Sequence, residues 1–472
     1  MDRREWLKSW GCGFGALALQ AMLAEQASAK ADPLAPKPPH HPPRAKRVIF
    51  LWMQGGPSQV DLFDYKPQLA KLDGEALPYS MPSNRAMPGV AYSKLMGPIA
   101  EFAPAGQSGM QVSDLLPHLS QHVDDICLLK AMEADSEAHA PAVRQLHTGA
   151  TQLVRPSIGS WVAYGLGTEN RNLPAFVTIA PNIGGDGGSV QLYGNAFLPA
   201  VYQGTALGNS STGAGGATIG YLDDPSMGDA SKRRQLDLIQ DMNRSHLERH
   251  HADRRLEGAI ESFELAFRMQ AEVPALLDLA GESQATRELY GIGAKPTDDF
   301  GRQCLLARRF AEAGVRFIQI TSNGWDSHAN IRSAHPNKCL SVDRPIAALI
   351  QDLKQRGLFE DTLLVWSGEF GRTPHYQDLQ DGAGNPDTYG RGHNPYGFCA
   401  WLAGGGVRGG MTLGELDDFG FRAVSDKVHI HDLHATILHL LGLDHERLTY
   451  PYSGREFRLT DVYGRVVNEI LA

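Results

Sequence analysis

The sequence contains little cysteine, no excess of positive charge and no nucleotide-binding loop. Five cysteines occur among 472 residues, widely spaced and without a CxxC pair, which excludes a disulfide framework and a thiolate zinc site. No GxxxxGK[ST] motif occurs, so nucleotide hydrolysis of the P-loop type is excluded. The formal net charge of −9 argues against nucleic acid and against an anionic membrane surface as partners.

Long apolar runs are also absent, except for a weak one near the N-terminus. Arg3 and Arg4 lie in DRREWLK, a close variant of the twin-arginine export signal, and a Gly/Ala-rich segment and the small-x-small site Ala27-Ser28-Ala29 follow. This pattern predicts a signal peptide over residues 1–29 and export through the twin-arginine machinery to the periplasm or the exterior. No stable membrane span should remain after processing, because a span needs ~20 apolar residues.

The rest of the chain predicts an α/β fold. Residues 30–46 are proline-rich and basic, which predicts an extended, mobile linker before a domain over 47–472. Apolar runs predict buried strands and periodic segments predict helices between them, so that parallel βαβ units follow. A loop-rich and helical insertion is expected near 182–285. The predicted strands are 47–53, 126–132, 315–322 and 362–366, and the predicted helices are 142–146, 303–314 and 343–357.

Polar tips follow apolar stretches at three places in the C-terminal third. The segments are GWDSH at 324–328, LLVWSGEFGRTP at 363–374 and the stretch that begins RGHNPYG at 391. Ligands of an open α/β sheet bind outside the carboxyl ends of the strands. We therefore expect the tips to converge on a divalent metal, zinc first, with manganese, calcium or iron as alternatives. The predicted ligands are Asp326, His328, Glu369 and His393.

These motifs resemble, in order along the chain, the exported sulfatase-like family called domain of unknown function 1501, in the alkaline phosphatase superfamily. The resemblance also includes QGGPSQVDLFD at 54–64 and HDLHATIL at 431–438. It implies an alkaline phosphatase/sulfatase-like fold, a mostly parallel sheet with helices on both faces. The family has no settled activity, so the resemblance implies fold and site location rather than a reaction.

Two departures from active members of that superfamily bear on the metals. Gln54 stands where those enzymes carry an Asp after the first strand, and Glu369-Phe370 stands where they carry an Asp-His pair. The resemblance therefore implies that one metal site is kept and that the second is degraded, since Phe cannot ligate. Asp61 would substitute as a ligand if the loop after the first strand folds back over the site, and Asp64 is the alternative. The ligands of the kept site are Asp326, His328 and His393.

The sequence does not decide which residues are the catalytic groups. Sulfatases place a Cys-x-Pro-x-Arg motif before Thr-Gly, and here His139 stands in the place of that cysteine without the arginine, which excludes a formylglycine mechanism. His139 is a metal ligand, a general base or a nucleophile, or else a helix-capping or core histidine. Ser58 is an alternative nucleophile, although GGPS is also turn chemistry. Arg372 either binds an oxyanion or forms a structural salt bridge.

Two functions are consistent with these residues. The first is a metal-dependent hydrolase of sulfate or phosphate esters on an exported substrate, with water or His139 as the attacking group. The second is a catalytically degenerate binding or envelope-assembly protein on the same fold. The retained Asp, Glu and His residues favour the hydrolase, and the altered Asp-His pair favours the binding protein.

Overall fold

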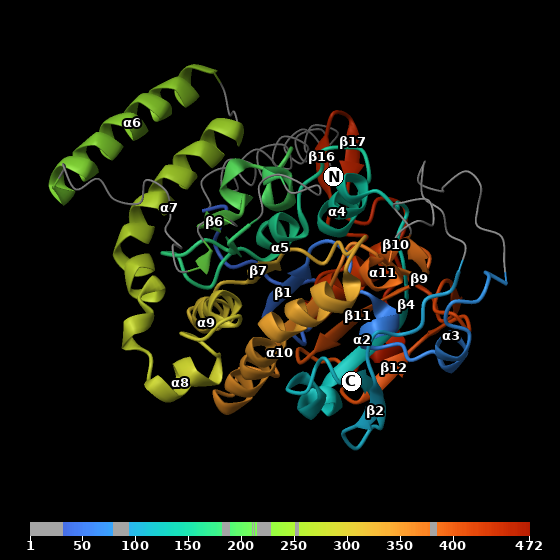
Figure 1. Ribbon diagram of the computed structural model, residues 1–472. Helices are drawn as coiled ribbons and strands as arrows, with labels where there is room; N and C mark the ends of the chain where they lie inside the picture. Colours follow the sequence, from blue (N-terminus) through green and yellow to red (C-terminus); the bar gives the residue numbers. More distant parts are fainter. Residues whose placement is uncertain are drawn as a thin grey trace, which may run out of the picture.

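The computed structural model describes residues 32–78, 94–181, 189–209, 211, 213–214, 228–250, 254–377 and 385–472. The predicted signal peptide lies outside these residues. Within them, the centre of the molecule is a nine-stranded sheet in the order β12-β4-β11-β8-β1-β7-β5-β6, and β15 also pairs with β4 (Figure 1). Its strands are β1 (Arg47–Met53), β4 (Ile126–Glu133), β5 (Phe176–Ile179), β6 (Thr205–Leu207), β7 (Phe317–Ser322), β8 (Thr362–Ser367), β11 (Phe398–Ala403), β12 (Met411–Leu413) and β15 (Val428–His429).

The sheet is parallel except for one strand. β11 runs antiparallel to both of its neighbours, β4 and β8, whereas every other pairing in the sheet is parallel. β1 lies between β7 and β8, and all seven of its residues are buried, as a continuous apolar run with both faces covered requires. The four strands predicted from apolar runs are confirmed, as is the mostly parallel α/β fold.

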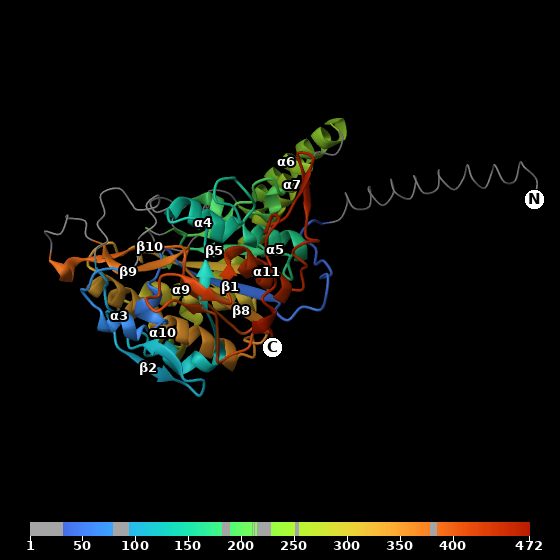
Figure 2. The same ribbon diagram turned by 90° about the vertical axis from the view of Figure 1, so that its right-hand side faces the viewer.

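Helices cover both faces of this sheet (Figure 2). α9 (Asp298–Glu312) and α10 (Ile331–Gln355) pack together on one face, with α9 against β7. α4 (His139–Thr148), α5 (Ile158–Leu166) and α11 (Ile430–Leu440) lie on the other face. There Leu146, Ile158 and Leu433 meet Phe50 and Phe317 of the sheet around a small apolar cavity. Burial of apolar side chains on both faces is the main stabilising contribution of this arrangement.

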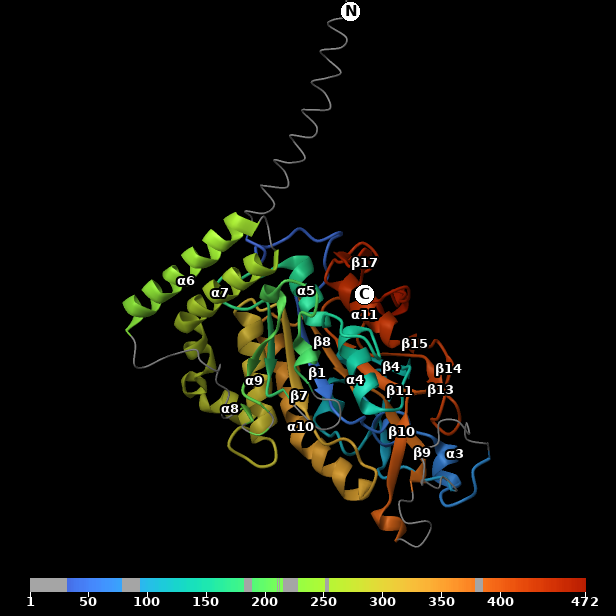
Figure 3. The ribbon, with the colours of Figure 1, turned by 90° about the horizontal axis from the view of Figure 1, so that it is seen from above.

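Smaller elements surround the sheet. The two-stranded sheets are β2 (Phe102–Ala105) with β3 (Met110–Ser113), β9 (Gly371–Gln377) with β10 (Gly390–Asn394), β13 (Glu415–Leu416) with β14 (Ala423–Ser425), and β16 (Tyr450–Tyr452) with β17 (Arg455–Phe457). The remaining helices are α2 (Gln59–Leu62), α3 (Pro67–Lys71), α6 (Asp229–His250), α7 (Arg254–Leu277) and α8 (Gln284–Leu289). α6 packs on α7 and stands out from the body of the molecule (Figure 3), in the segment where the sequence predicted a helical insertion. No helix within the described residues combines the length and the apolar character that crossing a bilayer needs.

The proline-rich segment differs from the separate, mobile linker that the sequence predicted. Leu34 is buried in the main core, and the backbone of the described part is hydrogen-bonded to the domain. The amide of Lys37 donates to Leu166 O at 3.0 Å, and the amide of Arg44 donates to Leu440 O at 2.8 Å. Proline fixes the backbone of this segment in an extended form, and carbonyls in the last turns of α5 and α11 supply its hydrogen-bond acceptors.

Four cysteines and two tryptophans beside the site lie in the core. Cys127, Cys304, Cys339 and Cys399 are free and buried. Trp325 and Trp366, beside the polar tips, are also buried, so neither presents an exposed ring for stacking on a sugar.

Candidate metal centre

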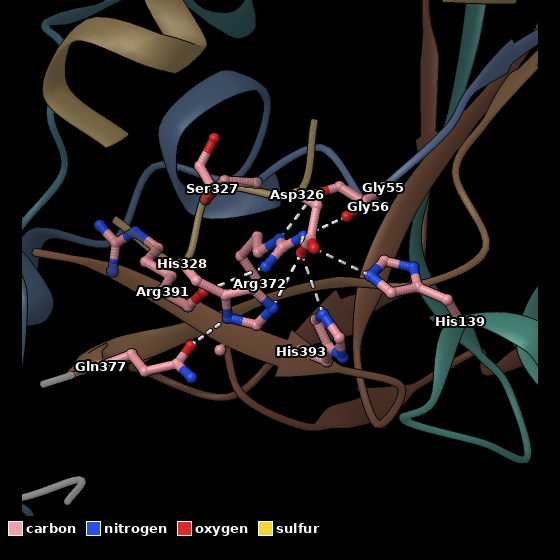
Figure 4. Close-up of polar contacts among 12 residues, drawn as sticks. Gly55, Gly56, His139, Asp326, Ser327, His328, Arg372, Gln377, Arg391 and His393 are labelled. Carbon is pink, nitrogen blue, oxygen red and sulfur yellow. Dashed lines mark hydrogen bonds and ion pairs between the residues drawn. The ribbon is translucent and has the colours of Figure 1, made fainter. Parts of the chain in front are cut away.

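Four side chains from three separate parts of the fold converge at one edge of the sheet. His139 opens α4 directly after β4, Asp326 and His328 lie between β7 and α10, and His393 lies on β10. Because β4 and β7 run parallel, their carboxyl ends meet at the same edge. One ligand atom from each side chain can be chosen so that all four lie within 4.8 Å of one another. We refer to these four residues as the histidine–aspartate cluster (Figure 4).

The carboxylate of Asp326 is the centre of the cluster. His328 Nε2 lies 3.0 Å and His393 Nε2 3.1 Å from Asp326 Oδ1, and His139 Nε2 lies 3.2 Å from Oδ2. The side chain of His393 is 4% exposed, whereas that of His328 is 23% exposed. The cluster is therefore closed on the His393 side and open to solvent beside His328.

The other nitrogen of each imidazole faces an oxygen acceptor. Nδ1 of His139 lies 2.8 Å from Glu369 Oε1, and Nδ1 of His393 lies 2.6 Å from the backbone oxygen of Glu137. Nδ1 of His328 contacts Oε1 of Gln377. In a neutral imidazole, an acceptor at Nδ1 holds the proton on that nitrogen, so that Nε2 presents its lone pair. Histidine ligands of metals are oriented in this way by their second nitrogen.

The protonation state of His393 indicates that the site fits a cation. Burial, together with the positive charge of Arg372, lowers the pKa of His393 to about 3, although Asp326 opposes the shift. The neutral ring has one N–H but faces two oxygen acceptors, Glu137 O and Asp326 Oδ1. One of these contacts must place a lone pair against an oxygen, which is repulsive. A divalent cation between Nε2 and Asp326 removes the repulsion, so the donor set fits a metal.

The surroundings of His139 raise its pKa, whereas those of His393 lower the pKa of that ring. Burial opposes its protonation, but hydrogen bonds and charges from Asp326 and Glu369 outweigh burial and raise the pKa of His139 to about 9. The same contacts act on Asp326: burial opposes ionisation, yet hydrogen bonds from the three imidazoles, with the charge of Arg372, hold its pKa well below the usual range. Without a metal, a proton on His139 partly compensates the two carboxylates. A metal cation that binds here has to displace that proton.

Arg372 supports the cluster from behind rather than facing a substrate. Its side chain is fully buried, with Nη2 in contact with Asp326 Oδ1. Its Nε donates to Gly56 O at 2.9 Å and its Nη1 to Arg391 O at 3.1 Å. The sequence left two roles open for Arg372, and the structure shows the salt bridge, which is made with Asp326. The guanidinium has no exposed edge for an oxyanion, so the predicted oxyanion role is corrected.

Glu369 also lies behind the cluster instead of within it. Its side chain is fully buried, and Oε1 accepts from Gly55 N at 2.9 Å as well as facing His139. Oε2 accepts a long hydrogen bond of 3.4 Å from the indole of Trp52. These contacts occupy both carboxylate oxygens. The prediction that Glu369 is a direct ligand is therefore corrected: it holds the ring of His139.

Asp61 and Ser58 are occupied elsewhere. Asp61 is fully buried and accepts from Arg391 Nε at 2.8 Å, and Ser58 Oγ donates to Asp61 Oδ2 at 2.5 Å. The carboxylate of Asp61 is therefore directed to Arg391 on β10 and not into the cluster. The predicted substitution of Asp61 as a metal ligand and the alternative nucleophile Ser58 are both corrected. Asp64, the other substitute, is paired with Lys66 and Lys130.

Phe370 occupies the space next to the cluster where the resemblance implied a degraded second site. Its ring stacks on His393 with centroids 4.4 Å apart and lies 5.0 Å from the ring of His139. The loop after β1 also passes close to the backbone of Asp326. Gly55 has φ +114°, and a Cβ there would lie 2.5 Å from the amide nitrogen of Asp326, so glycine is required at this approach. Phe370 thus packs against two rings of the cluster and offers no ligand atom there.

Sequence reasoning missed the acceptors that orient two of the histidines. Gln377 ends β9, and the carbonyl of Glu137 precedes α4. A backbone carbonyl carries no side-chain signal in a sequence. Gln377 lies only three residues after the SGEFGRTP motif, but a lone glutamine in a strand has no distinctive pattern. Neither position could be found without the tertiary arrangement.

The fold and the site define an α/β protein with a candidate metal centre at the carboxyl edge of a mostly parallel sheet. The chain belongs to the family described as Protein of unknown function (DUF1501), which matches residues 45–471. This confirms the family that the motifs resemble. No curated protein matches the chain.

Several solved structures are similar to the chain at low identity. The lipoteichoic acid synthase LtaP from Listeria monocytogenes is 9% identical, over 90% of this chain and 78% of that chain, with a TM-score of 0.37. The PsFucS1 sulfatase from Pseudoalteromonas sp. is 13% identical, over 85% and 69%, with a TM-score of 0.36. The alkaline phosphatase from the Antarctic bacterium TAB5 is 12% identical, over 84% and 98%, with a TM-score of 0.33.

Proposed function

We propose that the protein is a metal-dependent hydrolase of sulfate or phosphate esters, with the histidine–aspartate cluster as its metal centre. The observation that supports this most directly is the arrangement of the three imidazoles. Each turns Nε2 toward Asp326 while its Nδ1 is held by an oxygen acceptor. Such an arrangement is stable when a cation lies between the nitrogens and the carboxylate. Its partly exposed position beside His328 would admit a substrate.

The donor set favours some cations over others. Three imidazole nitrogens and one carboxylate suit zinc, manganese or iron. Calcium prefers six to eight oxygen ligands, so it is the least suited of the four metals considered. A bound cation would supply Lewis-acid polarisation of an ester oxygen and would lower the pKa of a nearby water toward neutrality.

The surrounding side chains favour attack by water. Two hydroxyls close to the cluster in the chain are held in hydrogen bonds, Ser58 Oγ by Asp61 and Ser327 Oγ by His335 at 3.0 Å. His139 is held by Glu369 at one nitrogen and faces Asp326 with the other, so we assign it to ligation rather than to nucleophilic attack. The oxygen of water forms the new bond to phosphorus or sulfur, the bond to the ester oxygen breaks, and one proton of the water ends on the leaving alcohol.

A binding or envelope-assembly role is the second candidate, and one observation favours it. Phe370 packs beside His139 and His393 and offers no ligand atom for a second cation that would share the charge of a transferring group. In this alternative the cluster holds a cation that binds an anionic ligand without turning it over.

Turnover on small esters separates the two candidates. Protein loaded with zinc, manganese or iron is assayed with 4-nitrophenyl sulfate, 4-nitrophenyl phosphate and bis(4-nitrophenyl) phosphate. We expect hydrolysis of at least one ester and a loss of about 100-fold or more in kcat/KM for His328→Ala, which removes a group at the metal. His122→Ala, in a half-buried pair with Asp125 elsewhere, is the matched control. Full metal content without turnover on any of the three esters would favour the binding role.

We also propose that the protein is exported by the twin-arginine pathway to the periplasm or beyond. The support is Arg3-Arg4 with the Gly/Ala-rich segment and Ala27-Ser28-Ala29. Replacing both arginines by lysine keeps the charge but is expected to leave the precursor in the cytoplasm, since the signal is read by a receptor. Fractionation with an antibody measures this, and normal processing of the double variant would refute the assignment.

A further inference from the structure

A polar cavity lies near the cluster, because the segment that joins β7 to α10 contributes residues to both. Its volume is about 210 Å³. It lies at the carboxyl end of β7, with walls from α9 and α10, the two helices that pack together on one face of the sheet (Figure 2). The polar residues that line it include Asp299, Gln303, Thr321, Asn323, Lys338 and Ser341. This is enough room for one sugar-sized ligand, and its lining is mainly polar.

Two groups in the lining have unused hydrogen-bonding capacity. Oγ1 of Thr321 and Oδ1 of Asn323 are buried and have no hydrogen-bond partner among the described residues. Thr321 as a whole is only 2% exposed. Buried polar atoms without partners are rare in folded proteins because each carries a desolvation penalty. Hydroxyl groups of a ligand would satisfy both atoms.

Lys338 supplies a positive charge without a counter-ion. Burial is the only effect that lowers the pKa of Lys338, and no carboxylate of the described part of the chain pairs with its ammonium. A Cβ on Gly324 would lie 3.0 Å from Lys338 Nζ, so the ammonium reaches the backbone of the joining segment. An ammonium that is half-buried and unpaired is suited to a carboxylate, sulfate or phosphate group of a ligand.

The carboxylate in the lining does not cancel this charge. Asp299 Oδ1 accepts from Ala214 N at 2.7 Å, and Oδ2 accepts from Gln303 Nε2 at 2.9 Å. Its charge is thus partly satisfied from α9, while Lys338 approaches from α10. The anionic group of a ligand would lie at the Lys338 end, and its hydroxyls would face Asp299 and Gln303.

The cavity and the cluster share one short segment. Asn323 lines the cavity and Asp326 is the centre of the cluster, three residues later. Three residues span at most ~11 Å even when fully extended. A single molecule with a sugar ring between its two functional groups can therefore reach both places.

We propose that this cavity binds the anionic sugar unit of a larger ester substrate, such as a uronate or a sulfated sugar, next to the reacting ester. Its role as a substrate subsite rests on the hydrolase function proposed above, whereas the binding itself does not. The carboxylate or sulfate contacts Lys338, and ring hydroxyls contact Thr321 and Asn323.

Calorimetric titration of chelator-treated protein at low ionic strength tests the binding independently of any hydrolysis. The probes are D-glucuronate and glucose 6-sulfate, which differ in the anionic group, and glucose as the neutral control. We expect both anions to bind at least tenfold more tightly than glucose. Lys338→Met keeps the length of the side chain and should weaken the anions about 10- to 100-fold, as the loss of a charged hydrogen bond predicts, without changing the affinity for glucose.

Two further variants keep the test decisive. Asn323→Asp is nearly isosteric and should weaken both anions through repulsion, whereas Lys354→Met, at an exposed pair with Asp125, should have no effect. A preference for only one of the two anions would identify the group that the site accepts. Equal affinity of wild type and Lys338→Met for the anions, or no binding of either anion at millimolar concentration, would overturn the proposal. A lack of esterase turnover would not, because the titration needs neither metal nor reaction.

Discussion

Replacing His393 by alanine is expected to remove most of the bound metal from the protein. His393 is the most buried imidazole of the cluster, and its neutral ring cannot satisfy both Glu137 O and Asp326 without a cation. Outer-sphere partners of metal ligands are worth about 10- to 100-fold in affinity, so loss of a direct ligand should exceed this. Elemental analysis after dialysis measures the metal per chain.

Thermal unfolding gives an independent reading of the same site. A ligand that binds only the folded state stabilises it by about 2.7 kcal/mol at 100 times its Kd. A chelator should therefore lower the Tm of the wild type but leave the Tm of His393→Ala almost unchanged. His122→Ala is the control and should keep both the metal and the chelator effect. Full metal content in His393→Ala would show that the cluster is not the metal site.

Replacing Arg391 by methionine is expected to destabilise the fold by about 3–5 kcal/mol, the usual effect of removing one member of a buried ion pair. Arg391 and Asp61 both have fully buried side chains, and Nη2 of Arg391 also donates to Gly97 O at 2.8 Å. Burial opposes the ionisation of Asp61, but the charge and hydrogen bonds of Arg391 outweigh it and lower the pKa of Asp61. Urea denaturation measures the change in the free energy of unfolding.

A double variant distinguishes the contribution of the Arg391–Asp61 ion pair from the other contacts of each side chain. Asp61→Asn with Arg391→Met leaves no unpaired charge, so its destabilisation should be clearly smaller than the sum of the two single changes. Lys354→Met breaks an exposed pair and should change the free energy of unfolding by at most about 1 kcal/mol. A loss below about 1 kcal/mol for Arg391→Met alone would contradict the assigned role. Because the pKa of Asp61 is lowered, the contribution of the pair is present above pH ~4 and is lost as the pH falls below that value.

The fold could be predicted from local patterns to a large extent. The apolar run of β1 and the alternation of strand and helix around α10 are properties of neighbouring residues, and they predicted the buried parallel strands. The packing of residues 32–46 could not be predicted in this way. A proline-rich basic segment has the composition of a linker, but Leu34 finds an apolar site in the core and the ends of α5 and α11 offer free carbonyls.

The site was predictable only in part. Asp326, His328 and His393 follow strands or motifs, and the rule that ligands gather at carboxyl ends of strands predicted their convergence. His139 was noticed only because it stands in the place of a sulfatase cysteine, and its role stayed open. Glu369 has the same local signal as a ligand, a carboxylate after a strand, yet it lies behind His139.

What the sequence by itself determined is the α/β architecture, the family and the edge of the sheet at which chemistry is expected, because these depend on periodicity and on motifs that are local in the chain. Tertiary structure alone decided which polar groups face each other. Arg391 and Asp61 are 330 residues apart and satisfy each other's buried charge, so Asp61 is not free for a metal. The same competition for partners turned Arg372 and Glu369 into supports of the cluster and left Lys338 without a counter-ion. Pairing of buried charges depends on distances across the fold, and no local pattern encodes them.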